Sequence, residues 1–246
     1  ESGVLVLERA GAKWGRGRIG LSGTVPLGLL PEDLPLEFAR GTGPAEFVLD
    51  VEDFAPEATG FLPEGISGLV SLRATGRADH PDLQALDGEI RFGALDLKVD
   101  TIGFSQAEPV LIEIRRGVAT IARLALSGPE TRIEASGTAG VYPRGPLDLA
   151  VEGSLDAGLL GVFSEGVKTA GELRIDARVA GSLDAPVLSG RAEMDNGKLA
   201  LQSPRIAADD LKMRLDLTSD SIIVRELTGV LNGGAMSVEG SIGYRD

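Results

Sequence analysis

The residues from Leu188 to Tyr244 alternate between apolar and polar side chains with a period of two. The apolar positions are Met194; Leu199 and Leu201; Leu211, Met213, Leu215 and Leu217; and Met236, Val238, Ile242 and Tyr244. Successive side chains of a strand point to opposite faces, so this period predicts strands that each have one apolar face. Asp195-Asn196-Gly197 predicts a hairpin turn between two of them, because Asn and Gly tolerate positive φ. The stretch is therefore predicted to be a meander of short antiparallel strands.

The same meander recurs earlier in the chain. Three landmarks lie 102 or 103 residues apart: Gly43-Pro44 and Gly145-Pro146, Gly88 and Gly190, and Gly137 and Gly240. We expect residues 1–43 to be the end of a preceding repeat and a loop, residues 44–144 a first full repeat, and residues 145–246 a second. This period exceeds the roughly 20–50 residues of ordinary solenoid units, so each unit should be a small meander within one continuous sheet.

The predicted elements are short strands and one or two short helices. Strands are expected at Phe47–Val51, Leu69–Ala74, Gly88–Phe92, Leu95–Val99, Val110–Ile114, Val118–Leu126, Thr131–Val141, Leu147–Val151, Glu172–Val179 and Leu188–Met194. Helices are expected within Phe54–Leu62 and Leu155–Phe163, and a loop over residues 26–41. Roughly 16–18 strands spaced about 4.8 Å apart would make a sheet about 80 Å long. The predicted fold class is all-β.

Composition narrows the function classes. The formal net charge of −13 argues against nucleic acid and disfavours simple electrostatic docking to anionic lipid headgroups. The absence of Cys excludes disulfides and thiolate chemistry. No run approaches the roughly 20 apolar residues of a membrane helix. The chain starts in mid-pattern at Glu1, so we expect a fragment of a longer repetitive protein.

No constellation of catalytic residues stands out. Gly15 to Gly20 matches G-x-G-x-x-G, but the strand-like Leu21–Val25 follows where a dinucleotide site needs a helix, so a tight turn is expected, with Trp14 beside it as a packing or strand-end residue. His80 is the one His, which argues against a metal site or a Ser-His-Asp triad. The adjacent carboxylates Glu32-Asp33, Glu52-Asp53 and Asp209-Asp210 point to opposite faces of a strand. We expect a non-enzymatic protein without cofactor or metal.

Strands with one apolar face must bury that face against something. The expected helices are too short to cover a sheet. The strands could therefore stack as a two-sheet sandwich, close into a barrel, or form one long curled trough whose apolar inside is covered by a ligand. Alternation is the same in all three arrangements. The tandem repeat favours the trough, because copies in register extend a sheet whereas sandwiches and barrels close.

The order of several motifs resembles the C-terminal repeats of the TamB family, within the wider AsmA-like proteins. The motifs are Asp184-Ala185-Pro186, Leu188-Ser189-Gly190 with Asn196-Gly197 and Leu199, the run Leu211–Leu217, and Leu227-Thr228-Gly229-Val230-Leu231-Asn232-Gly233-Gly234 leading to Val238-Glu239-Gly240. The resemblance covers most of the chain and is clearest over residues 171–246. It implies a long curled sheet with a hydrophobic groove in the periplasm of a Gram-negative envelope, anchored to the inner membrane in the full-length protein. Such proteins are thought to move phospholipid between the membranes, and TamB is linked to outer-membrane protein assembly with a barrel partner, TamA.

Under this resemblance the alternating apolar residues would line a lipid groove. They are Phe47, Leu49, Val51, Ile90, Phe92, Leu97, Ile112, Ile114, Ile133, Leu149, Val151, Leu173, Ile175, Met194, Leu199, Leu201, Leu211, Met213, Leu215, Leu217, Met236, Val238 and Ile242. Lys212 and Arg214 would face water. Two alternatives remain: an assembly scaffold whose open sheet edges template client strands, and a repeat adhesin that buries its apolar face internally.

Overall fold

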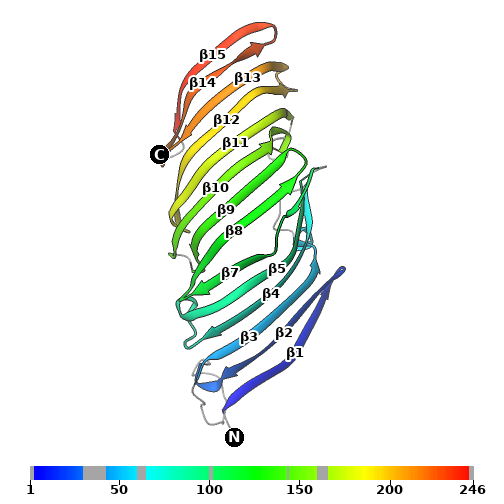
Figure 1. The fold of residues 1–246 in the computed structure, drawn as a ribbon, viewed down its shortest axis with the longest axis vertical. Helices are drawn as coiled ribbons and strands as arrows, with labels where there is room; N and C mark the ends of the chain where they lie inside the picture. The colour runs from blue at the N-terminus through cyan, green and yellow to red at the C-terminus, as the bar shows by residue number, and fades with distance from the viewer. Residues whose placement is uncertain are drawn as a thin grey trace.

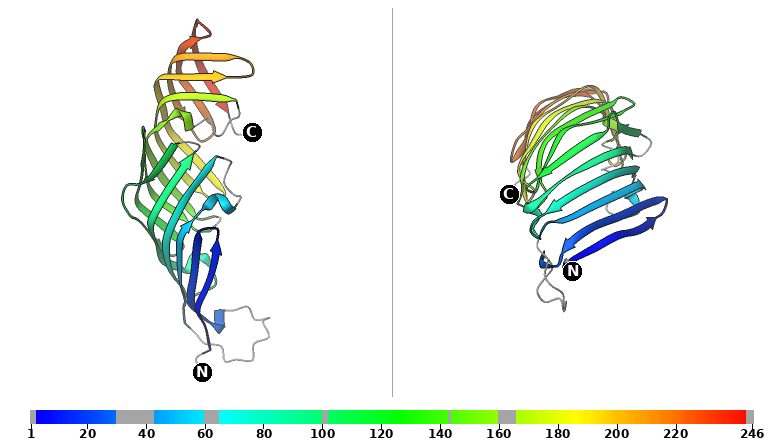
Figure 2. Two further views of the ribbon diagram at one scale, coloured as in Figure 1. Left: turned by 90° about the vertical axis from the view of Figure 1, so that its right-hand side faces the viewer. Right: turned by 60° about the horizontal axis from the view of Figure 1, so that its bottom comes forward.

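The chain forms one antiparallel sheet. The computed structural model describes residues 3–29, 43–59, 65–99, 102–142, 144–159 and 166–243. Within these ranges fifteen strands join into a single elongated, curled sheet with almost no helix (Figure 1; Figure 2). The predicted all-β class and the long curled sheet are confirmed, and no second sheet packs on the first in the described ranges.

The strands follow one another along the chain and, with one exception, along the sheet. They are β1 (Val4–Trp14), β2 (Gly17–Pro26), β3 (Ala45–Phe54), β4 (Ile66–Ala78), β5 (Leu86–Val99), β6 (Ile102–Gln106), β7 (Val110–Arg115), β8 (Val118–Gly128), β9 (Thr131–Gly140), β10 (Pro146–Asp156), β11 (Val167–Ser182), β12 (Ala185–Leu201), β13 (Ile206–Leu217), β14 (Ser221–Leu231) and β15 (Gly234–Gly243). Four 3-10 turns lie between strands in the described ranges: η1 (Leu27–Leu29), η2 (Pro56–Thr59), η3 (Leu83–Ala85) and a fourth at residues 157–159. Among the described residues, β1 and β15 are the edges of the sheet.

The exception is a strand position shared by β6 and β7. Both strands lie between β5 and β8, with β6 pairing one end of β5 and β7 the other. The break falls at Pro109, which has no backbone N–H to donate to a ladder. Fifteen strands thus fill fourteen positions, or roughly 60 Å of sheet at about 4.8 Å per strand. The expected 16–18 strands exceed the fifteen of the described ranges, where Gly88–Phe92 and Leu95–Val99 belong to the single strand β5.

The elements repeat in the order that the sequence indicates. The series β3, η2, β4, β5, β6 with β7, β8 and β9 is followed by β10, a 3-10 turn at residues 157–159, β11, β12, β13, β14 and β15. The β6–β7 pair of the first series occupies the place of the unbroken β13 in the second. The repeated meander architecture is therefore present in the structure as well as in the glycine spacing.

The predicted hairpin turn at Asp195-Asn196-Gly197 is wrong. These residues lie inside β12, which continues to Leu201. Asn196 has a φ of 55°, as expected, but the extra residue forms a bulge: the register between β12 and β13 shifts between Met194 and Gly197. The neighbouring strands have similar shifts, near Asp210 in β13 and Arg225 in β14. A positive-φ residue fits a bulge as well as a turn, and bulges bend and twist a strand, which contributes to the curl of the sheet.

The predicted helices are single 3-10 turns in the described ranges. The first is η2, which covers only part of Phe54–Leu62, and residues 60–64 lie outside the described residues. The second covers residues 157–159, after Leu155 and Asp156 have completed β10. Most of the expected loop at 26–41 also lies outside the described ranges, and its start is the end of β2 followed by η1. The G-x-G-x-x-G stretch begins with a tight turn at Gly15 and Arg16, where Gly15 has a φ of 61°, and continues as β2 from Gly17. Trp14 ends β1 and pairs with Gly17 across the hairpin.

The surface area is that of a single layer. The chain exposes 15297 Å², against about 10,400 Å² expected for a compact monomer of this mass. No large side chain in the described part of the chain is fully buried. The densest packing is on one face of β10 to β14, around Leu173, Met194 and Leu211. The fold therefore leaves most of one sheet face without a protein layer over it.

Candidate functional site

The strand register defines two faces. Residues directly opposite each other in an antiparallel pair lie on the same face, so rows of paired residues can be followed across the sheet. One row starts at Leu49 in β3 and runs through Ala74, Ile90 and Ile112 to Ile121 in β8. We call the face that carries this row the inner face and the opposite one the outer face.

The inner face continues into the second repeat without a change of character. A row starts at Leu155 in β10 and runs through Leu173, Met194, Met213 and Leu227 to Val238 in β15. The bulges between β12 and β14 preserve this face, because an extra residue on one strand is absorbed locally. The apolar side chains of both repeats thus form one continuous surface.

No charged side chain occupies a paired position of the inner face in the described strands. Its polar side chains are Gln106, Thr131 and Thr169, and each is held by the protein. Thr169 Oγ1 donates to the carbonyl of Ala157 at 2.5 Å, and Thr131 Oγ1 accepts from the Asp156 N–H at 3.3 Å. These two contacts fix the 157–159 turn against the inner face, where Ala157 is fully buried.

Gln106 occupies the break between β6 and β7. Its side-chain nitrogen donates to the carbonyls of Phe92 at 3.3 Å and Gly93 at 3.1 Å, both in β5. Its side-chain oxygen is buried without a hydrogen-bond partner in the described residues. The Gln106 side chain thus links β6 to β5 at the break, and its amide nitrogen is already engaged in hydrogen bonds within the sheet.

All 23 residues expected to line a groove lie on the inner face by this register. Four are buried by neighbouring side chains: Ile114, Leu173, Met194 and Leu211. Val238 and Ile242, on the edge strand β15, are 43% and 62% exposed. The other seventeen are half-buried. The structure brings these side chains together on one surface.

Sequence reasoning missed other residues of the same face. They include Leu72, Val110, Ile121, Leu124, Leu126, Leu155, Val179, Leu188, Ile222, Val224, Leu227 and Leu231. Most continue the period-two pattern of a predicted strand and could have been found by extending it. Leu124 and Leu227 could not, because each follows a bulge that shifts the phase of the pattern by one residue.

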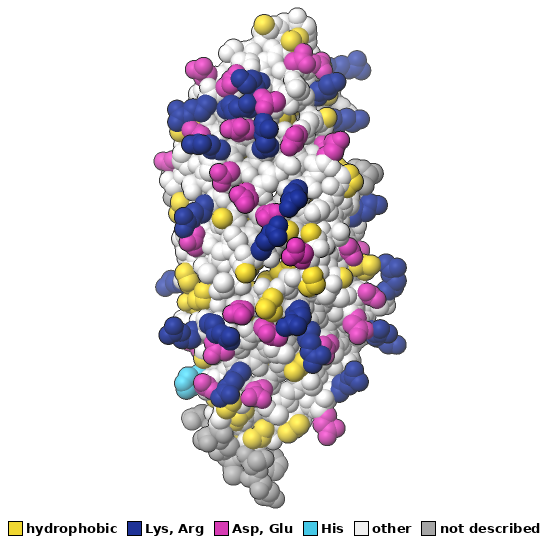
Figure 3. Space-filling model, in the orientation of Figure 1, with side chains coloured by type: hydrophobic (Ala, Val, Ile, Leu, Met, Phe, Trp, Pro, Cys, Tyr) yellow, Lys and Arg dark blue, Asp and Glu magenta, His cyan; other side chains and the backbone are white. Residues whose placement is uncertain are grey.

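The outer face is charged and laced with cross-strand ion pairs. Acidic and basic side chains are spread over the face shown in Figure 3. Arg178 pairs with Asp148 at 2.6 Å, and Lys212 pairs with Glu226 at 2.9 Å. Lys212 and Arg214 lie on this face, as expected, but the side chain of Arg214 is only 26% exposed because it pairs with Asp195 at 2.8 Å.

Glu134 lies at the centre of one such network and supports a prediction about pH. Arg123 and Arg132 donate hydrogen bonds to its carboxylate, Arg123 most strongly, and lower its pKa from 4.5 to about 2. Since the folded-state pKa is the lower one, this interaction stabilises the fold above about pH 4.5 and is lost as the pH falls toward 2. Carboxyl-carbon NMR titration should give a pKa near 2 for Glu134, and Arg123→Gln should raise it toward the ordinary value. An unchanged pKa in that variant would contradict the assigned cause.

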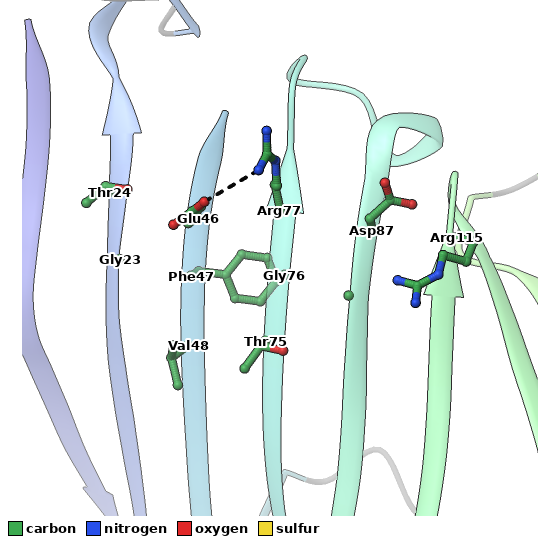
Figure 4. A pocket seen from close by; sticks show the side chains of 11 residues that line it. Gly23, Thr24, Glu46, Phe47, Val48, Thr75, Gly76, Arg77, Asp87 and Arg115 are labelled. Carbon is green, nitrogen blue, oxygen red and sulfur yellow. Dashed lines mark ion pairs between the residues drawn. The ribbon is translucent and has the colours of Figure 1, made fainter. Parts of the chain in front are cut away.

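Surface hollows are also present in the described part of the chain. One of about 460 Å³ is lined by Glu46, Arg77, Asp87 and Arg115 in the first repeat, with Glu46 and Arg77 3.9 Å apart (Figure 4). Beneath it, on the inner face, the ring of Phe47 packs against Gly76, where a Cβ would collide with it. This hollow is open and carries both signs of charge, so no single ligand class fits it better than another.

Two further observations concern metals and membranes. Among the described residues, no group of three or more His, Cys, Asp or Glu could hold a metal ion. No helix in the described ranges is long and apolar enough to cross a membrane.

The chain was compared with protein-family models, with curated proteins and with solved structures. None of the three comparisons returned a match. The candidate functional surface is the inner face, because its apolar rows continue across both repeats.

Proposed function

We propose that the inner face binds the acyl chains of phospholipids, and that the chain is part of a TamB-like protein that carries lipid between the inner and outer membranes of a Gram-negative envelope. The observation that supports this is the continuity of the inner face: apolar rows cross both repeats with no charged side chain at a paired position of the described strands. The resemblance of the glycine and alternation motifs to TamB repeats supports the membrane context.

The energetics favour an apolar occupant. An apolar patch much larger than about 300–600 Å² is uncommon on a monomer unless something binds there. Covering it with acyl chains would gain about 0.8 kcal/mol for each buried CH₂ group. Aliphatic side chains such as Leu149 and Leu215 make no directional demands, so a chain can slide along the face without breaking specific bonds. A continuous trough therefore suits transport along the sheet better than tight binding at one point.

Site-specific photo-crosslinking tests the proposal. Leu149 and Ala150 are neighbours in β10. The side chain of Leu149 points to the inner face, and that of Ala150 points to the outer face, where it is exposed. A photoreactive residue at Leu149 should label phospholipid in cells, and the same residue at Ala150 should not. The proposal fails if neither position labels lipid, or if both do so equally.

An assembly scaffold is the second candidate, and it concerns β15, which has one strand partner, β14, among the described residues. Val238 and Ile242 are exposed there, beside backbone groups that no other described strand pairs. Such an edge can add a strand from a partner, including a TamA-type barrel. Proline substitutions in β15 should then impair outer-membrane protein assembly while lipid labelling at Leu149 persists. If the proline substitutions lower lipid labelling at Leu149 but leave outer-membrane protein assembly unchanged, the scaffold hypothesis is wrong.

A further inference from the structure

The tip of the β1–β2 hairpin carries the chain's only Trp between basic residues. We call residues Lys13 to Arg18 the hairpin tip. It projects from the right-hand rim of the sheet, beyond the end of β3 (Figure 1). Trp14 is 50% exposed and lies on the inner face, at the end of the row that Gly17 continues toward β3. An exposed indole at the margin of an apolar surface is characteristic of groups that sit at a membrane–water interface.

Two basic residues of the hairpin tip are placed where their charges repel each other. Lys13 directly faces Arg18 across the hairpin, and like charges in that position repel. Arg18 is compensated on its other side by Glu52, at 2.6 Å. Lys13 and Arg16 take part in no ion pair of the described residues, in a protein whose net charge is −13. These two cations are therefore available to an external anion.

The tip is held firmly enough to present these groups together. The turn is two residues long, with Gly15 at a φ of 61°. Gly17 is buried, and a Cβ at that position would lie 3.0 Å from the Phe54 Cα and 3.1 Å from the Asp53 carbonyl oxygen. Only glycine lets the tip approach β3 this closely. The position of Trp14 relative to the sheet is thus set by backbone packing.

From these observations we propose that the hairpin tip docks on the surface of a bilayer that contains anionic phospholipid. Lys13 and Arg16 contact the headgroup phosphates, and the indole of Trp14 enters the interface. The inference deepens the proposed function and rests on it for its purpose, because the row from Trp14 would lead an acyl chain from the interface to the inner face. The acidic remainder of the chain is repelled by the same surface, which restricts contact to this tip.

The single Trp makes the test direct. With vesicles of phosphatidylcholine and phosphatidylglycerol, Trp14 emission should shift to shorter wavelength and be quenched by lipids brominated near the headgroup end of the acyl chain. Vesicles of phosphatidylcholine alone should give much weaker binding. Each cation near an anionic surface contributes about fivefold to binding, so Lys13→Gln/Arg16→Gln should bind about 25-fold more weakly. Trp14→Ala, followed by co-sedimentation, should also lower binding.

A control of equal charge change separates docking from bulk electrostatics. Lys98 in β5 and Arg205 after β12 are exposed and take part in no ion pair of the described residues. Lys98→Gln/Arg205→Gln should leave vesicle binding within about twofold of the parent. No emission shift, or equal weakening in both double variants, would overturn the proposal. Lipid labelling at Leu149 tests the inner face separately from the hairpin tip. If vesicles bind the tip but Leu149 labels no lipid, the proposed lipid binding on the inner face is wrong and the docking proposal stands. If Leu149 labels lipid but vesicles do not bind the tip, the docking proposal is wrong and lipid binding on the inner face stands.

Discussion

Gly190→Ala should destabilise the sheet by about 3 kcal/mol. Gly190 lies in β12 with a φ of 143°, a region that residues with a Cβ rarely adopt. A Cβ there would overlap the carbonyl oxygen of Asp176 and lie 2.6 Å from the Ala177 Cα. Both obstacles are backbone atoms of β11, so no side-chain rotation relieves them. Urea unfolding followed by far-ultraviolet circular dichroism measures the change.

Gly20→Ala is the matched control for this substitution. Gly20 is also a strand glycine, in β2, but a Cβ there would meet nothing nearer than 4.0 Å. Alanine loses less backbone entropy on folding than glycine does, so this variant should be as stable as the parent or more stable by about 0.5–1 kcal/mol. Equal destabilisation by the two substitutions would show that the conformation and close approach of Gly190 are not what makes it necessary.

If the inner face binds acyl chains, as proposed, Val151→Asp should reduce the phospholipid bound to the purified protein by at least tenfold. Val151 lies on the inner face of β10, opposite Ala135 in β9 and Ala177 in β11. A carboxylate in that row would have to be desolvated under an acyl chain with no cation of the inner face to pair with, which is strongly unfavourable. Quantifying co-purified phospholipid by mass spectrometry checks the result.

The neighbouring outer-face variant Ala150→Asp controls for charge and for strand position. Ala150 is opposite Arg178 and Ser136, so a new carboxylate there meets a cation and solvent. Its lipid content should match that of the parent. Urea midpoints of both variants show whether the sheet has remained folded. If Val151→Asp stays folded and keeps its lipid, acyl chains do not run along the inner face at β10.

Much of the fold follows from side-chain alternation alone. The alternation predicts strands that each bury one face. The 102-residue spacing of Gly43-Pro44 and Gly145-Pro146 predicts that the same meander occurs twice. Both signals are read directly from the sequence without knowledge of strand pairing, and they were sufficient to predict an all-β chain. They also placed the 23 predicted inner-face residues on one surface, since every strand obeys the same period of two.

The bulges could not be predicted from the sequence. Asn196-Gly197 favours positive φ, and that preference is satisfied equally by a hairpin turn or by an extra residue within a strand. The pairing of β12 with β11 and β13 on either side decides for the bulge, because those ladders continue to Leu201. The same non-local pairing shifts the phase of the pattern at Leu124 and Leu227, which sequence reasoning therefore missed.

The sequence by itself determined that each strand of this protein has one apolar face, because the alternation of side chains is a property of every short segment. Only the tertiary structure decided what happens to those faces. A sandwich, a barrel and a trough share the same alternation, and they differ in whether the ends of the sheet meet or a second layer covers it. In the described residues β1 and β15 remain separate edges and no second layer is present, so the inner face stays open along both repeats. The physical reason is that closure depends on accumulated twist and on bulges such as that at Asn196, which arise from pairing between strands and not from the pattern within one.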